Sequence, residues 1–498
     1  MGPRFSLNTF VFSLLFTTSL LATGIESQKV SVLKILSDFS VIIENSETDF
    51  PAFEAKLNTL FSSLENIDVT KIDLDEVRRN TNLIVRNTAE FDRQIVQLIS
   101  KWKESGHWTK KSETTVRNTI RGLRYFGDSV GEMSLSLGDS KSPVFNFKTF
   151  YGGEPFVITA DGQHFDPLQN FRPGDLVLMR GSSEVSAAIA RVADVNTQFS
   201  HIAIVTQDPV SKELFLQEAL IEKGLVLSPI KSLVDHAIGR AVVLRHEDPV
   251  RAEQASRSAW KRSHDGQKYI YDFSMKYKIS PQELSENPEL FCSLVVRDAF
   301  YGDEKAPYLL PKDPSQLSPK NREFLKLIGI SDSTTDIFAP SDIELDPDFI
   351  KVAEFRDFSK TPQQRVYDVI FDKVFAWMDE GGHFQKSKLL DLIANLGFQI
   401  SKIEPVKKLL WKFGVPVAPH VKPNVLRAVV SIGLIRMHLQ KELQPKIDAF
   451  VKKNGVVPTP QTLENWLEKI RDKGTNKAFK TLKLGPRKTA NSCLKFYK

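Results

Sequence analysis

Three side chains in this sequence have the types and order needed for a thiol to attack a carbonyl group. Cys292 is the only cysteine in the body of the chain, since the second, Cys493, lies near the C-terminus. A thiol becomes a good nucleophile when a neighbouring base takes its proton. His201 lies upstream in a strand-like segment and is the candidate base, and Glu218 is the candidate carboxylate beside it.

The segment after His201 predicts a hairpin that brings Glu218 to the imidazole. Residues 202–206 and 214–220 are typical of strands, and Asp208-Pro209-Val210-Ser211 fits a type I turn. A hairpin centred on this turn gives the pairs His201–Glu218, Ala203–Leu216 and Val205–Leu214. Directly opposed residues have Cβ atoms roughly 4.5–5.5 Å apart, so Glu218 could orient the ring. A two-residue slip would keep the face and change the partner, whereas a one-residue slip would separate them.

Cys292 is predicted to lie near the start of a helix. Asn287-Pro288 fits an N-cap followed by proline at the first helical position, with the helix continuing through Val295, Ala299 and Phe300. A thiol in the first turn or two is placed where the helix dipole favours thiolate. The alternative is a structural cysteine, because cysteine is often buried and the surrounding Phe-Cys-Ser-Leu-Val-Val is typical of a core.

Several short motifs together resemble one known family. They are Gly174-Asp175-Leu176-Val177-Leu178, Phe199-Ser200-His201-Ile202-Ala203-Ile204-Val205, Leu216-Gln217-Glu218-Ala219 with Gly224-Leu225-Val226, Tyr271-Asp272-Phe273 and Phe291-Cys292-Ser293. This set resembles the permuted papain-like amidases of the YiiX/YaeF type, within the NlpC/P60 superfamily, over roughly residues 165–305. In ordinary papain-like enzymes the cysteine precedes the histidine, whereas the permuted group has the reverse order found here.

The resemblance implies roles for individual residues. Cys292 would be the nucleophile, His201 the general base and Glu218 the orienting carboxylate. Asp175, Tyr271, Asp272 and Ser293 would line the substrate cleft. Many relatives carry an acidic residue directly after Cys-Ser, where this chain has Leu294.

The N-terminus predicts export. Residues 1–24 have the form of a signal peptide, with Arg4 at the start, an apolar stretch over 9–21 and small residues Ala22-Thr23-Gly24 for cleavage. An uncleaved membrane anchor is the alternative, although the stretch is below the usual span of about 20 apolar residues. The expected location is periplasmic or extracellular. In an oxidising compartment, a Cys292–Cys493 disulfide is the alternative to a free nucleophile.

Helical regions are predicted on both sides of the catalytic segment. Residues 28–140 predict a three-helix bundle that shields or positions the catalytic domain, with a partner-binding coiled coil as the alternative. Its apolar seam is Leu74, Val77, Thr81, Ile84, Thr88, Phe91, Ile95, Leu98 and Trp102. Inside this region Gly127-Asp128-Ser129-Val130-Gly131 matches the nucleophile-elbow pattern, but that motif needs a strand before the serine and none is predicted.

The predicted fold class is α+β, with a permuted papain-like (NlpC/P60) catalytic domain over 145–358 between two helical regions. Candidate strands at 176–179, 202–206, 214–220 and 241–244 are joined locally, which predicts antiparallel pairing. Helices are expected at 183–193 and 251–263. Residues 359–498 predict a helical region that ends in a basic tail from Lys473 onward.

The sequence favours hydrolysis without a cofactor. It has no His-Glu-x-x-His pair, no Cys-x-x-Cys and no phosphate loop, so neither a metal nor another cofactor is expected. The family implies a cell-wall peptide or a lipid-linked acyl group as substrate. The basic tail could attract an anionic envelope polymer or a membrane surface, and no nucleic-acid module is present. The expected function is an exported cysteine hydrolase cleaving an amide or ester bond. The alternative is a catalytically inactive papain-like scaffold or binding protein of the cell envelope.

Overall fold

The computed structural model describes residues 29–44, 49–137, 158–159, 165–195, 198–234, 238–302, 305, 307–318, 322–331, 333–385 and 423–485. The predicted signal peptide, Cys493 and the helix expected around Leu389, Leu392 and Leu396 lie outside these residues. None of the helices in the described ranges is both long and apolar enough to cross a membrane.

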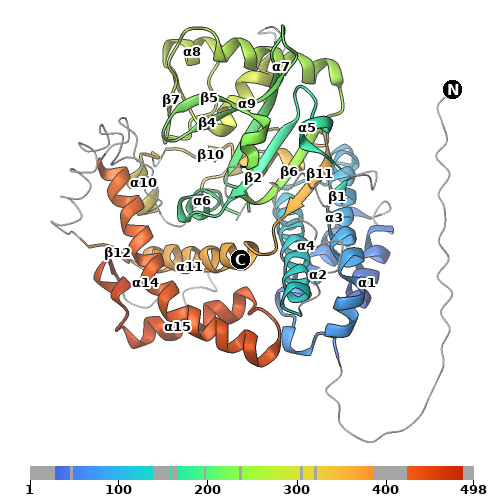
Figure 1. Cartoon of the computed structure of the whole chain (residues 1–498), viewed down its shortest axis with the longest axis vertical. Coiled ribbons are helices and arrows are strands. Elements are labelled where there is room, and N and C mark those ends of the chain that lie inside the picture. Colours follow the sequence, from blue (N-terminus) through green and yellow to red (C-terminus); the bar gives the residue numbers. More distant parts are fainter. Residues whose placement is uncertain are drawn as a thin grey trace, which may run out of the picture.

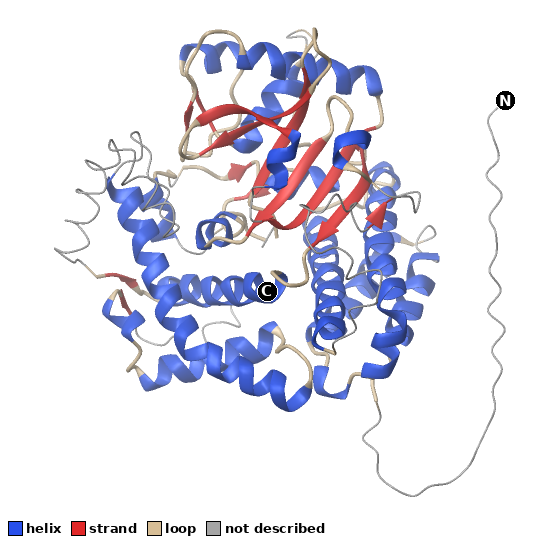
Figure 2. Ribbon diagram, in the orientation of Figure 1, coloured by secondary structure: helices blue, strands red, loops and turns tan. Residues whose placement is uncertain are grey.

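A seven-stranded sheet forms the centre of the structure (Figures 1 and 2). Its strand order is β1-β11-β6-β2-β3-β4-β5, and every neighbouring pair is antiparallel. The bounds are β1 Ile158–Thr159, β2 Leu176–Gly181, β3 His201–Gln207, β4 Leu214–Leu220, β5 Gly224–Pro229, β6 Ile238–His246 and β11 Phe349–Arg356. The predicted antiparallel pairing in an α+β domain is therefore confirmed, and β6 is longer than predicted.

Alternate residues of β3 face two different cores. Ile202 and Ile204 lie in the core that contains helices α7 (Pro249–Ser263) and α9 (Cys292–Tyr301). Ala203 and Val205 lie in a smaller core on the opposite face. This alternation is the two-residue period of a strand buried on both faces. Other elements of this part are α5 Pro167–Asn170, α6 Glu184–Ile189, η4 Ile230–Val234, β7 Ile270–Tyr271, α8 Pro281–Glu286, β8 Glu289–Leu290, β9 Ser315–Gln316, α10 Arg322–Ile328, β10 Asp336–Ile337 and η5 Pro340–Leu345.

The described part of the N-terminal region, residues 29–44 and 49–137, contains four helices rather than the three predicted. They are α1 Val32–Glu44, α2 Phe50–Glu65, α3 Leu74–Glu104 and α4 Lys110–Ser136, with a short turn η1 Val69–Lys71 between α2 and α3. The predicted seam of α3 is buried from Val77 to Trp102. Asp49, Asp73 and Thr109 cap the starts of α2, α3 and α4 through side-chain hydrogen bonds to backbone N–H groups.

The elbow-like motif lies inside α4, so its glycines have a packing role. A Cβ on Gly127 would lie 2.5 Å from Nη1 of Arg356, and a Cβ on Gly131 would lie 2.6 Å from the ring of Phe358. The glycines therefore allow the end of β11 and the residues after it to approach the helix closely. No strand precedes Ser129, which removes the serine-hydrolase interpretation.

A buried network of charges joins helices α3 and α4 to the sheet. Arg124 of α4 is 1% exposed and pairs with Asp92 at 3.2 Å and with Glu344 at 2.5 Å. Asp128 of α4 pairs with Arg240 of β6, which crosses the interface with the sheet, and Glu132 of α4 pairs with Arg365 of the helix Thr361–Asp379. Removing one partner of a buried pair costs about 3–5 kcal/mol, so this interface fixes the bundle against the sheet.

The C-terminal region is helical as expected, and part of the predicted basic tail is folded. Its elements are α11 Thr361–Asp379, β12 His383–Phe384, α14 Pro423–Asn454, α15 Pro460–Lys473, η6 Lys477–Lys480 and β13 Leu482–Lys483. Strand β13 pairs with β12, and Ala478 and Leu482 are fully buried. The tail prediction was wrong for residues 477–483, because these two apolar side chains join the core despite the lysines between them. Residues 486–498 lie outside the described residues.

Candidate active site

The β3–β4 hairpin has a register two residues away from the predicted one. Val205 pairs with Leu216 and Gln207 with Leu214, so the predicted pairs of His201, Ala203 and Val205 were wrong. The connection is longer than a four-residue turn, because Asp208 N–H donates to the carbonyl of Glu213 and Lys212 closes the loop at φ 64°. A two-residue shift preserves the face of every side chain. His201 and Glu218 therefore still project from the same side of the sheet.

The imidazole of His201 reaches Glu218 diagonally across the two strands. Its Nε2 lies 2.8 Å from Oε2 of Glu218, whose side chain is fully buried. The second carboxylate oxygen accepts a 2.6 Å hydrogen bond from the hydroxyl of Ser228 on β5. Both carboxylate oxygens are thus engaged, which fixes the carboxylate and in turn the plane of the ring. With Nε2 at Glu218, Nδ1 is the ring nitrogen left for the thiol.

Cys292 is the first residue of its helix, so the predicted helix start was wrong by several residues. Asn287 ends α8 rather than starting a helix, and residues 289–290 form the short strand β8 before α9. The N-terminal signal belongs to α8, where Ser280 forms a capping box and Pro281 follows it. Phe291 occupies the N-cap of α9 without a side-chain hydrogen bond. The thiol therefore lies closer to the positive end of the helix than predicted.

The thiol and the imidazole act on each other directly. Burial would raise the pKa of the Cys292 thiol, but hydrogen bonding to His201, the charge of that ring and the backbone N–H of Ile202 together lower the pKa below its usual value. Burial would lower the pKa of His201, but the hydrogen bonds and charges of Cys292 and Glu218 outweigh it and raise the pKa to about 10. Such mutual shifts are those of a thiolate–imidazolium pair.

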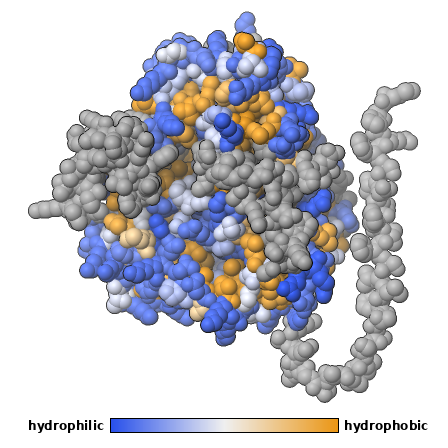
Figure 3. Space-filling view, viewed as in Figure 1, coloured by the Kyte–Doolittle hydropathy of each residue, from blue (hydrophilic) through white to orange (hydrophobic). Residues whose placement is uncertain are grey.

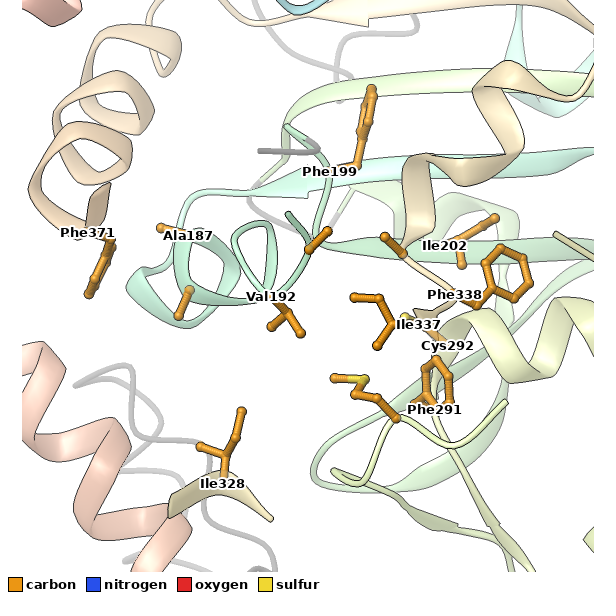
Figure 4. Close-up of a cluster of buried hydrophobic side chains, with 14 of the residues drawn as sticks. Ala187, Val192, Phe199, Ile202, Phe291, Cys292, Ile328, Ile337, Phe338 and Phe371 are labelled. Atoms are coloured by element: carbon orange, nitrogen blue, oxygen red, sulfur yellow. The ribbon is translucent and has the colours of Figure 1, made fainter. Parts of the chain in front are cut away.

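Apolar side chains surround the sulfur. Cys292 is 4% exposed and carries a free thiol. Phe291, Ile337 and Phe338 lie around it in the close-up of the core (Figure 4). Leu294, at the position where many relatives are acidic, is 1% exposed and belongs to the same core. A water-poor environment strengthens the electrostatic contact between sulfur and ring.

Two of the four predicted cleft residues lie near the sulfur. Tyr271 is buried, and its pKa is raised well above 10 by burial and by the negative charge of Cys292. Ser293 is fully buried, and its hydroxyl contributes to lowering the pKa of Cys292. Asp272 instead holds a local turn, accepting from the backbone N–H and the hydroxyl of Ser274.

Asp175 is not brought to the site. It precedes β2 and its carbonyl accepts from the N–H of Val205, whereas His201 pairs with Met179 at the other end of that strand. Its carboxylate is held by Arg245 at 2.7 and 2.8 Å. A structural ion pair therefore explains this residue better than substrate contact.

The sequence interpretation missed the residues that support His201. Gln198 is 1% exposed at φ 59°, and its Oε1 accepts a 3.0 Å hydrogen bond from Arg124 of the bundle. The guanidinium of Arg124 also lies 4.9 Å from the ring centre of Phe199. The hydroxyl of Ser200 accepts from Gly181 N–H. These contacts hold the segment that enters β3, and only tertiary structure reveals them, because Arg124 comes from a distant helix.

The comparison with family models agrees with the segment that carries these residues. Residues 170–309 of the 498 match the model of the permuted papain-like amidase enzymes, YaeF/YiiX, C92 family. No match was found among curated proteins or among solved structures. The matched segment includes the thiol, the imidazole and the carboxylate described above. This segment of the chain is therefore similar to the permuted papain-like amidases of the YaeF/YiiX type.

Proposed function

We propose that the protein is an exported cysteine hydrolase that cleaves an amide or ester bond, with Cys292 as nucleophile, His201 as general base and Glu218 as the orienting carboxylate. The observation that carries the proposal is the 2.8 Å contact between His201 Nε2 and Glu218 in a ring that also interacts with the thiol. Nucleophile, base and orienter are the three roles of such a triad. The permuted papain-like (NlpC/P60) topology is part of the same proposal.

The proposed reaction follows from the position of each group. The thiolate of Cys292 attacks the substrate carbonyl carbon, and the electron pair of the carbonyl moves to its oxygen. The first N–H groups of α9 have no partners within the helix, so they can stabilise that oxyanion. The His201 imidazolium then gives its proton to the leaving amine or alcohol. Water, deprotonated by the neutral imidazole, then attacks the thioester carbon, and the C–S bond breaks. The carboxylic acid product leaves, and the thiolate–imidazolium pair is restored.

The lowered pKa of Cys292 favours an enzyme over an inactive scaffold. A structural cysteine buried among apolar side chains has a raised pKa and reacts slowly. Here the imidazole, the N–H of Ile202 and the helix end all favour thiolate in spite of burial. A binding protein that merely retained the fold has no need for a carboxylate held by Ser228 behind the imidazole.

The substrate classes proposed are cell-wall peptides and lipid-linked acyl groups. The test measures hydrolysis of both substrate classes in parallel by the wild type, by Cys292→Ala and by His201→Ala. The single variant Cys493→Ser is the matched cysteine control. Hydrolysis by the wild type and by Cys493→Ser, and its loss in the other two variants, is the expected result. Equal turnover by the wild type and Cys292→Ala would refute the assignment. The proposed location outside the cytoplasm is checked by fractionating cells that express the full chain.

A further inference from the structure

The two helical regions enclose a cavity outside the segment that matches the amidase family. Its volume is about 220 Å³, and its lining comes from α2, η1, α4, α11 and the beginning of α15. In the space-filling view, hydrophobic patches are scattered over the lower half of the molecule as well as gathered in the upper half (Figure 3). Helix α11, which contacts both α4 and α15, lies in that lower half (Figure 1). A cavity of about 150 Å³ admits a benzene ring, so this one has room for a short apolar chain.

The inner wall of the cavity is apolar. The buried side chains that form it are Leu64, Val69, Ile72, Phe126, Val130 and Met133. Gly122 of α4 allows the ring of Phe61 to lie against the helix, since a Cβ there would come within 2.9 Å of the ring. Such a wall offers dispersion contacts and no hydrogen-bonding group to a polar ligand.

The charged residues of the lining are mostly acidic, and the remaining polar residues are neutral. Glu65, Asp372 and Glu464 line the cavity together with a single cation, Arg121. Arg121 lies 3.9 Å from Glu65, and Asp372 accepts from Arg191 at 2.7 and 3.1 Å.

Glu464 differs from the other two carboxylates. Within the described ranges it accepts no hydrogen bond and forms no ion pair, and the neighbouring Lys373 is engaged by Glu468 at 2.6 Å. Burial and the nearby carboxylates raise the pKa of Glu464 although Lys373 attracts it, so a cation placed beside this carboxylate is stabilised.

We propose that this cavity binds an amphiphile with a short apolar chain and one basic amino group. The chain fills the wall formed by α2 and α4, and the ammonium group meets Glu464. The inference is independent of the proposed function, because none of the lining residues lies within 170–309. It gives the two flanking helical regions a shared binding role that neither could have alone.

Competition with a fluorescent probe tests the proposal on the full-length protein. The probe is N-phenyl-1-naphthylamine, which is uncharged and brightens in apolar surroundings. The competitors are decylamine, decanol and decyl sulfate below micelle-forming concentrations. Decylamine is expected to displace the probe at a concentration at least tenfold lower than decanol, with decyl sulfate weakest. Equal midpoints for the amine and the alcohol would overturn the proposal, as would a wild type that leaves the probe dark.

Two pairs of variants locate the binding. Glu464→Gln is expected to remove the tenfold advantage of the amine, whereas Glu253→Gln, an exposed carboxylate on α7, leaves it unchanged. Ser129→Phe fills the cavity and is expected to abolish probe emission, whereas Ser63→Phe, an exposed serine with the same helical hydrogen bond, does not. Thermal unfolding of each variant verifies the fold. Undiminished emission in folded Ser129→Phe would show that the probe binds elsewhere, which contradicts the proposal.

Discussion

Replacing Glu218 by glutamine removes the negative charge behind His201 while keeping the shape of the side chain. The hydrogen bond at 2.8 Å joins a fully buried carboxylate to the ring. Hydrogen bonds to charged groups contribute about 1.5–3 kcal/mol, which corresponds to a shift of about one to two pKa units. The imidazolium form of His201 becomes less favourable, and through it the thiolate of Cys292. The neutral thiol–imidazole pair therefore gains at the expense of the ion pair.

The expected result is a lower plateau in the pH profile of thiol alkylation. In the wild type the ion pair exists above the lowered pKa of Cys292 and below the pKa of His201 at about 10. In Glu218→Gln the equilibrium between the ion pair and the neutral pair, which is independent of pH because both forms hold one proton, moves toward the neutral pair by about 10- to 100-fold, so the iodoacetamide rate on the plateau falls by up to that factor. Cys493→Ser serves as background, so that only Cys292 reacts.

The matched control for this prediction is Ser228→Ala, which removes one hydrogen bond from Glu218 but leaves its charge. A neutral hydrogen bond contributes about 0.5–1.5 kcal/mol, so the plateau is expected to fall by no more than about tenfold. If the profile of Glu218→Gln superimposes on that of the wild type, the carboxylate does not act on the thiol through His201, and the reasoning is refuted.

Three further predictions concern the surroundings of the site. In His201→Ala the ring no longer lowers the pKa of the thiol, and burial, the largest remaining effect, raises it, so alkylation at pH 7 should slow by about tenfold or more. An unchanged rate would mean that the ring does not activate the sulfur. Gln198→Ala should lower the free energy of unfolding, measured in urea, by about 1–3 kcal/mol. Gln198→Gly should be more stable than Gln198→Ala by about 0.5–1 kcal/mol, because residue 198 has a φ of 59°, which favours glycine. Equal stability of the two variants would contradict this prediction. Arg245→Met leaves Asp175 buried without its guanidinium partner and should lower the free energy of unfolding by about 3–5 kcal/mol. The alkylation rate of the folded protein should stay at the wild-type value, because the Arg245–Asp175 pair is remote from His201.

Local periodicity allowed many helices and strands of this fold to be predicted. Features that depend on contacts between residues distant in the sequence could not be predicted in this way. The seam of α3 and the strands at 202–206 and 214–220 repeat apolar residues with the periods of their structures, so their positions were found. The start of α9 was missed because Asn287-Pro288 carries a helix-start signal that the structure does not use, while Ser280-Pro281 carries one that it does. The same local pattern therefore starts a helix at Ser280 but not at Asn287. We attribute the later start of α9 to the packing of Phe291 against the core.

The candidate site shows the same division. His201 and Glu218 were placed on one face because a two-residue error in register leaves faces unchanged. The error itself came from Lys212, whose left-handed backbone lengthens the loop although its side chain gives no sign of it. The contact of Arg124 with Gln198 could not be predicted, because charged residues on a helix are normally read as its solvent face.

The ionic interface between α4 and the sheet also determines what can be separated from this protein. A fragment that contains only residues 170–309 would leave Arg240 without its partner Asp128, which lies in the bundle. It would also lack Arg124, which donates a hydrogen bond to Gln198. The family resemblance therefore covers residues 170–309, whereas the unit that unfolds cooperatively also includes the helical bundle. Calorimetry of the intact chain should give one heat-absorption peak for the bundle and sheet together. Removal of residues 1–140, which contain the bundle, should yield insoluble protein rather than a smaller folded protein.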